Sequence, residues 1–107
     1  MLEYCVLTVL SAGESYGYEI VAALGKIDEF AVSESTVYPI LSRLRQEKYL
    51  KLRDVASPQG PPRRYFSLTA IGKVRLAEMN HHLTHINRAI SQLKQTPRKD
   101  LENDTPN

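Results

Sequence analysis

The sequence predicts a mainly α-helical fold with one small β-hairpin and a long C-terminal helix. Three observations predict it: apolar residues recur at helical spacing in three segments before residue 48, residues 49–68 alternate apolar and polar side chains around a turn, and residues after 69 repeat apolar positions every three or four residues. With 107 residues, of which 42% are hydrophobic and 24% charged, the chain is long enough for one globular domain.

The first two helices are predicted from apolar residues in the N-terminal third. Residues 2–10 are apolar nearly all round, which indicates a helix buried against more than one neighbour. A second helix is predicted over residues 16–27, with Ser15 as its N-cap. Its apolar stripe consists of Tyr16, Ile20, Leu24 and Ile27.

The third helix combines an apolar stripe with a polar face and ends near Lys48. Because proline is tolerated mainly in the first turn of a helix, Pro39 predicts an N-cap at Ser35 or Thr36, unless the helix is kinked. The stripe is Val37, Ile40, Leu41 and Leu44, at spacing i, i+3, i+4, i+7. The outward residues are Ser35, Tyr38, Ser42, Arg45 and Gln46.

Two strands and a last helix complete the prediction. Residues 49–55 and 63–68 alternate apolar and polar side chains, and the intervening proline and glycine residues favour a turn, so the pair is predicted to form a β-hairpin with a basic rim. Thr69 can cap a helix that continues to Gln95. Its apolar positions are spaced 3, 4, 3, 4, 3, as in a heptad seam: Leu76, Met79, Leu83, Ile86, Ile90 and Leu93.

The heptad seam predicts a homodimer. A helix from Thr69 to Gln95 would be about 40 Å long, which is longer than the preceding body of the chain can cover, so the exposed stripe needs a partner. The alternative is that the helix folds back on its own domain. The residues predicted at the dimer interface are Leu2, Cys5, Val6, Leu76, Met79, Leu83, Ile86, Ile90 and Leu93.

Charge is distributed unevenly along the chain. Residues 1–42 contain one basic and six acidic residues, a net charge of −5, whereas residues 43–75 contain nine basic and two acidic residues, a net charge of +7. A basic middle third is typical of a protein that binds a polyanion, although a solvated basic face would have the same composition.

The single cysteine and the N-terminal segment help to predict the cellular location of the protein. One cysteine excludes an internal disulfide, and Cys5 lies in an apolar run, which favours a small buried side chain over a redox-active pair of Cys5 residues across a dimer. The N-terminal run carries Glu3 and is too short to span a bilayer, so neither a signal peptide nor a membrane anchor is expected. The expected location is the cytoplasm.

Three helices followed by a β-hairpin is the order of a winged helix-turn-helix. In this fold the third helix enters the major groove of DNA, so it needs an apolar face for its own core and a polar face that reaches bases and phosphates. The rival interpretation is a winged helix that binds an acidic protein partner instead of DNA. The predicted organisation is a DNA-binding domain over residues 1–68, a dimerisation helix over 69–95 and a disordered tail over 96–107.

Three ordered motifs along the chain carry a family resemblance. They are Tyr16-Gly17-Tyr18-Glu19-Ile20, then Ser35-Thr36-Val37-Tyr38-Pro39-Ile40-Leu41-Ser42-Arg43-Leu44, and then Gly60-Pro61-Pro62-Arg63-Arg64-Tyr65-Phe66-Ser67-Leu68-Thr69 with Gly72. Together they resemble the PadR family of bacterial transcriptional regulators, in the short subgroup with a single C-terminal helix. The resemblance implies a winged-helix dimer, usually a repressor, and in some members the release of DNA on binding a small aromatic or drug-like ligand.

Ten residues are predicted to contact DNA, which we expect to be a palindromic operator. Arg63 and Arg64 are neighbours on a strand, so their side chains point to opposite faces and one of them is expected to reach a phosphate. Arg43 flanks the apolar stripe and has the alternative of pairing with an acidic residue. The predicted set is Tyr18, Ser35, Thr36, Tyr38, Pro39, Ser42, Arg43, Gln46, Arg63 and Arg64.

Enzymatic and metal-dependent functions are not predicted. The sequence has no nucleophile with a partnered base and no glycine-rich phosphate loop, so no cofactor is expected. Glu78, His81 and His85 share one side of the last helix at a spacing that can hold a metal. That side faces away from the heptad seam and no second cluster adds ligands, which favours a solvated face for these residues and His82.

Overall fold

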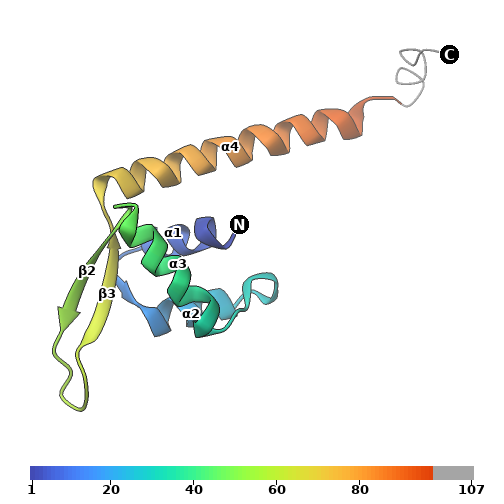
Figure 1. The fold of residues 1–107 in the computed structure, drawn as a ribbon. Helices are drawn as coiled ribbons and strands as arrows, with labels where there is room; N and C mark the ends of the chain where they lie inside the picture. The colour runs from blue at the N-terminus through green and yellow to red at the C-terminus, as the bar shows by residue number, and fades with distance from the viewer. Residues whose placement is uncertain (98–107) are drawn as a thin grey trace. The chain divides into compact units, whose positions relative to one another are not determined.

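The computed structural model describes residues 1–97, and its elements follow the predicted order with two short additions. Three helices precede a β-hairpin and one long helix follows it (Figure 1). The additions are β1 and η1, a single turn of 3₁₀ helix. The elements are α1 (Leu2–Ser11), β1 (Ser15–Tyr16), α2 (Gly17–Gly25), η1 (Asp28–Phe30), α3 (Glu34–Gln46), β2 (Leu50–Val55), β3 (Arg63–Leu68) and α4 (Ala70–Gln95).

Contacts divide the chain into two compact units, Met1–Ala77 and a second that begins at Glu78. The start of α4 belongs to the first unit, where Leu76 is buried. Thr69 caps α4, as the sequence predicts, because its Oγ1 accepts a hydrogen bond of 3.0 Å from the amide of Gly72. Residues 98–107 of the predicted tail lie outside the described residues.

The core of the first unit is built from the predicted apolar stripes. Most of the buried side chains come from α1, α2 and α3, and the hairpin adds Leu50, Phe66 and Leu68. Cys5 is buried among them, as expected for a small apolar side chain. The fully buried large side chains are Leu7, Ile20, Leu41, Leu44, Val6 and Val37. Because α3 contributes three of these six, its orientation is fixed by the core.

The hairpin is part of a three-stranded antiparallel sheet in the order β1-β3-β2. The β2–β3 pairing places Leu52 opposite Phe66 and Asp54 opposite Arg64. Figure 1 shows that the two strands continue beyond the helices of the first unit to a turn. The hairpin therefore presents its outer half to solvent while its inner half, next to Leu50 and Leu68, closes the core.

The predicted start of the second helix is wrong by one residue. Ser15 is not its N-cap but pairs with Phe66 in β1, and Tyr16 is the N-cap of α2 rather than part of its stripe. The sheet takes up the backbone of both residues, and the amide of Tyr16 donates a hydrogen bond of 3.0 Å to Oε1 of Glu19. The helix also ends earlier than predicted, so Ile27 lies outside it and is 50% exposed.

The predicted start of the third helix is also wrong. The N-cap is Ser33 and not Ser35 or Thr36, so Pro39 lies inside α3. The carbonyl of Ser33 accepts hydrogen bonds from the amides of Thr36 and Val37, which begins the helix early. The bond that Pro39 cannot donate would have gone to the carbonyl of Ser35, an exposed residue, so water can replace it.

Candidate nucleic-acid interface

The polar face of α3 is exposed, as the sequence predicts. Val37, Leu41 and Leu44 are buried, which leaves Ser35, Tyr38 and Ser42 on the outer side. The spacing i, i+3, i+7 places these three in one row along the helix, and Gln46 lies beside that row. The outer surface of α3 therefore consists of short polar side chains and one aromatic hydroxyl, which suits contact with the edges of bases.

Tyr38 packs against the beginning of α2. A Cβ atom added to Gly17 would lie 2.5 Å from Oη of Tyr38, so only glycine permits this approach. The tyrosine side chain is still 43% exposed. The Tyr38 hydroxyl thus lies beside the first residue of α2, at the positive end of the helix dipole.

The β2–β3 hairpin, which we call the wing, lies next to Tyr38 and the N-terminus of α2. A hollow of about 260 Å³ brings four predicted DNA contacts together with residues of the α2 N-terminus. The guanidinium of Arg63 lies 4.8 Å from the centre of the Tyr16 ring, a cation–π contact that holds it at the rim. The predicted contacts that line the hollow are Tyr18, Tyr38, Arg63 and Arg64.

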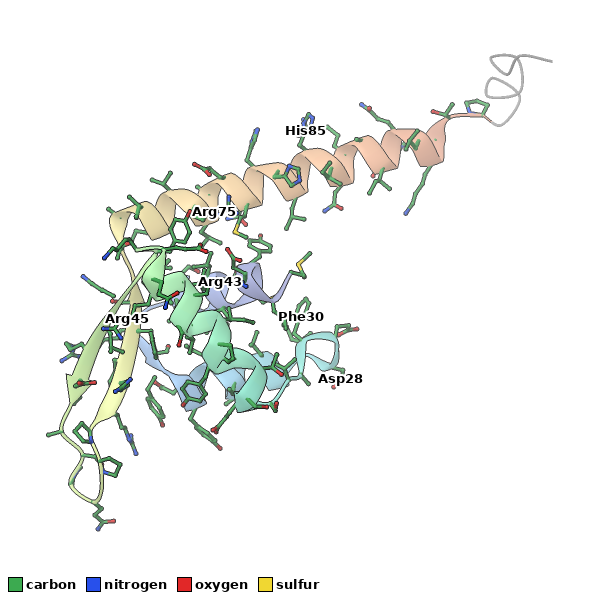
Figure 2. The ribbon with its side chains drawn as sticks, viewed as in Figure 1. Asp28, Phe30, Arg43, Arg45, Arg75 and His85 are labelled. Atoms are coloured by element: carbon green, nitrogen blue, oxygen red, sulfur yellow. The ribbon has the colours of Figure 1, made fainter. Side chains whose placement is uncertain are left out.

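Three arginines of the basic segment are paired with acidic side chains. Nη2 of Arg43 lies 3.0 Å from Oε2 of Glu3 on α1, which is the alternative that the sequence left open for Arg43. Figure 2 shows Arg43 on the α1 side of α3. Arg64 lies 3.9 Å from Oδ1 of Asp54 across the hairpin.

The third pair joins the wing to the turn before β1. Nε of Arg53 donates a hydrogen bond of 3.1 Å to Oε2 of Glu14, and Nη2 donates to the other carboxylate oxygen. This hydrogen-bonded guanidinium lowers the pKa of Glu14 below its ordinary value, and the carboxylate raises the pKa of Arg53. Arg53 is therefore engaged within the chain.

A second basic cluster lies at the C-terminal end of α3, which the predicted DNA set included only in part. Ser42, Arg45, Gln46 and Lys48 surround a hollow of about 320 Å³. Arg45 is on the same helical row as Ser35, Tyr38 and Ser42, a spacing that identified it as outward-facing in the sequence. Lys48 follows the helix, where periodicity gives no information about its direction.

The predicted dimer residues differ in how much surface they expose. Val6 is fully buried within one chain, and Cys5 and Leu76 are 9% and 8% exposed. In contrast, Ile86, Ile90 and Leu93 are 39%, 42% and 68% exposed. Met79, Leu83 and Leu2 are intermediate. The available apolar surface of α4 therefore lies in its C-terminal half.

A second apolar surface lies in the first unit, between α1 and the α2–η1 segment. It is a groove of about 220 Å³ whose lining is almost entirely apolar. Met1 and Ile27, at its edges, are 73% and 50% exposed. The remaining lining residues are Tyr4, Cys5, Thr8, Val9, Ala23, Leu24 and Phe30.

The histidines of α4 form no larger cluster. The rings of His81 and His85 stack with their centres 6.4 Å apart. Among residues 1–97 there is no group of three or more histidine, cysteine, aspartate or glutamate side chains arranged to hold a metal ion.

Comparison with known proteins places the chain in a family. The model of the transcriptional regulator PadR-like family matches residues 6–78. The chain belongs to the PadR-like family. This confirms the resemblance found in the sequence, and because the family consists of transcriptional regulators, it also agrees with the prediction that the chain is not an enzyme.

Solved structures of PadR-like proteins share the fold. A PadR-like transcription factor from Bacteroides fragilis is 35% identical, with a TM-score of 0.79 over 87% of this chain and 89% of that chain. A PadR-like regulator from Bacillus cereus is 34% identical, with a TM-score of 0.77 over 90% and 93%. PadR of Bacillus subtilis, solved in complex with operator DNA, is 28% identical, with a TM-score of 0.67 over 74% of this chain and 46% of that chain. These likenesses confirm the winged-helix fold.

In the part of the chain that the structure describes, no helix combines the length and apolarity that a transmembrane span needs.

Proposed function

We propose that the chain is a sequence-specific DNA-binding repressor that acts as a homodimer on a palindromic operator in the cytoplasm. The observation that carries the proposal is the exposed polar row of α3, bordered by the Tyr38–Arg63 hollow at the base of the wing. The operator complex of Bacillus subtilis PadR supports duplex DNA as the partner.

In this proposal α3 occupies the major groove. Its core-facing residues hold it rigidly, so Ser35, Ser42 and Gln46 meet base edges without reorganisation of the backbone. Thr36 and Pro39 flank this row in the first half of the helix and approach the wall of the groove. Base contacts specify the sequence, and the surrounding phosphate contacts fix the position of the helix.

Phosphate binding is assigned to the hollow between α2, α3 and the wing. The hydroxyls of Tyr18 and Tyr38 donate hydrogen bonds to phosphate oxygens, and Arg63 supplies the charge. Arg64 lies near Asp54, which supports Arg63 as the member of the pair that reaches the duplex. Arg43 is engaged with Glu3 and orients α3 rather than serving as the first phosphate contact.

Dimerisation is assigned to α4 together with the apolar groove beside α1. The occupant proposed for the groove is the C-terminal half of α4 from a second copy of the chain, because Ile86, Ile90 and Leu93 expose an apolar stripe of matching chemistry. A dimer presents two α3 helices, which requires two half-sites about one helical turn apart. Release of the DNA by a small aromatic or drug-like ligand is a further prediction, which rests on the family resemblance alone.

The proposal is tested by measuring binding to duplex DNA with fluorescence anisotropy at several salt concentrations. The probes are the promoter fragment of the chain's own gene and a mixed-sequence duplex of about 40 base pairs. Arg63→Gln is compared with Arg88→Gln, which makes the same charge change on α4. We expect Arg63→Gln to lower the slope of log K against log salt by about 0.9 for each bound subunit, and Arg88→Gln to leave it unchanged.

Two outcomes would contradict the proposal. If the wild-type dimer binds neither duplex at about 50 mM salt, the regulator is not a DNA-binding protein and the protein-binding alternative gains support. If Arg63→Gln and Arg88→Gln bind equally well, the DNA surface lies elsewhere than at the α3–wing hollow.

A further inference from the structure

Lys48 has an unfavourable backbone conformation. It follows the C-cap of α3 with φ of 70°, and it is the one residue other than glycine with positive φ within residues 1–97. Helices commonly end with glycine in this conformation, because a Cβ atom there collides with the backbone. A lysine at this position carries a conformational cost that glycine would remove.

The backbone at Lys48 is fixed by the rest of the first unit. Its carbonyl accepts a hydrogen bond of 2.6 Å from Oγ1 of Thr69, and the carbonyl of Tyr49 accepts one of 3.0 Å from the amide of Thr69. These bonds use only the backbone carbonyls of Lys48 and Tyr49, so they do not explain why the side chain at position 48 is lysine. Strain that is retained at a defined position is a reason to ask what the side chain does.

The side chain of Lys48 lines a hollow together with one other cation and two hydrogen-bond donors. The hollow that it lines with Ser42, Arg45 and Gln46 contains no carboxylate. No ion pair within residues 1–97 engages Arg45 or Lys48, in contrast to Arg43, Arg53 and Arg64. Figure 2 shows Arg45 on the side of α3 away from α1. Arg45 and Lys48 are thus two cations at the C-terminal end of α3 that no carboxylate engages among the described residues.

We propose that Arg45 and Lys48 form a second phosphate-binding site for duplex DNA, beside the base-contacting residues Ser42 and Gln46. The proposal rests on the proposed function, because it requires α3 to lie in the major groove. From Tyr38 to Arg45 the helix rises by about 10 Å, and Lys48 lies a further turn along the chain. This separation is close to the width of about 12 Å of the major groove. The Tyr38–Arg63 hollow and the Arg45–Lys48 site therefore contact phosphates on opposite sides of the groove.

Lys48→Gly distinguishes a phosphate-binding role of Lys48 from a structural one, because the Tm is expected to rise while the salt dependence of DNA binding falls. Removing the Cβ atom relieves the strain, so the Tm is expected to rise by about 2–4 °C. Removing the ammonium group eliminates one phosphate contact, so the salt slope on the mixed-sequence duplex falls by about 0.9 for each bound subunit. Lys48→Arg retains the charge and is expected to keep the wild-type slope.

Lys26 provides a matched control. It is the C-cap of α2, is exposed, and has φ of −72°, so Lys26→Gly removes the same charge at a helix end without relieving strain. It also lies at the end of α2 opposite to Gly17, which borders the DNA-facing hollow. We expect Lys26→Gly to lower the Tm slightly and to leave the salt slope unchanged.

The outcomes separate this inference from the proposed function. If Lys48→Gly binds the duplex with the wild-type slope while Arg63→Gln lowers it, the second site is overturned and the proposed function stands. If Lys48→Gly lowers both the Tm and the affinity and Lys48→Arg does not restore the slope, Lys48 is structural and the inference is also overturned. If wild type binds no duplex, both proposals fail together.

Discussion

The two units of the chain differ in how completely they bury their apolar residues. Every hydrophobic residue that is buried within residues 1–97 lies between Cys5 and Leu76, so the first unit closes its core in a single chain. After Glu78, Ile86, Ile90 and Leu93 retain the spacing of a helical seam but stay exposed. The same apolar periodicity therefore serves folding in one unit and is available for association in the other.

The largest expected effect is on the first unit, through the turn where α3, β2 and α4 meet. A Cβ atom at Gly72 would lie 2.1 Å from the carbonyl oxygen of Tyr49, a backbone atom that is held by Thr69. Gly72→Ala should therefore lower the free energy of unfolding by about 3 kcal/mol, measured by urea denaturation.

Gly25→Ala is the control for this prediction, because nothing lies within 4 Å of a Cβ atom at Gly25. Alanine is the better helix former, so this variant should be at least as stable as wild type. Equal stability of the two variants would show that the junction at Gly72 is not closely packed, and the contrast between the two units would weaken.

The second prediction concerns the unit that begins at Glu78. Leu83→Glu places a charge in the predicted heptad seam and should weaken the dimer by more than about 100-fold, because a buried unpaired carboxylate costs several kcal/mol. Light scattering should then report a monomer or an aggregate. Gln92→Glu makes the same charge change off the seam on the same helix and should leave the dimer intact.

An unchanged dimer in Leu83→Glu would move the interface away from α4. In that case the exposed residues Ile86, Ile90 and Leu93 would need a different explanation, and the groove beside α1 would not receive this helix.

The fold could be predicted from the sequence wherever packing follows a simple period. The stripe of Val37, Leu41 and Leu44 predicted α3 and its outer face, and the alternation in residues 63–68 predicted β3 with Phe66 and Leu68 in the core. In both places the local period and the long-range contacts agree, so the pattern is sufficient.

Prediction from the sequence was wrong where contacts with a distant segment determine the local structure. Ser15 and Tyr16 form β1 because the edge of β3, about 50 residues later, takes up their backbone, and no local pattern of two residues indicates a strand. Pro39 suggested a late start for α3, but the burial of Val37 and the carbonyl of Ser33 extend the helix through the proline.

The candidate site could be predicted in its residue types but not in its pairings. The sequence shows the basic residues only as one segment. In the structure Arg43, Arg53 and Arg64 have acidic neighbours. Arg45 and Lys48, in contrast, have no ion pair among the described residues. Glu3 and Glu14 are 40 and 39 residues away from their partners, so charge counting could not identify these pairs.

The smallest expected effect is the pH dependence of the Glu14–Arg53 pair, which acts within the first unit. The pKa of Glu14 is lowered in the folded chain, chiefly by its hydrogen bonds from Arg53. A carboxylate with a lowered folded pKa stabilises the fold above its unfolded pKa, and this contribution is lost as the pH falls through the folded value. Wild type should therefore exceed Glu14→Gln in stability at pH 7, and the difference should narrow as the pH is lowered from 7 to 3.

The effect is small because Arg53 and Glu14 are 64% and 32% exposed, so water and salt screen the pair. Urea denaturation of Glu14→Gln, Arg53→Gln and the double variant at both pH values isolates the interaction between the two side chains. Additive losses at pH 7 would mean that the pair does not hold the wing to the turn before β1. Non-additive losses that are smaller at pH 3 than at pH 7 would show that this ion pair fixes the wing, whereas the core of the first unit folds without it.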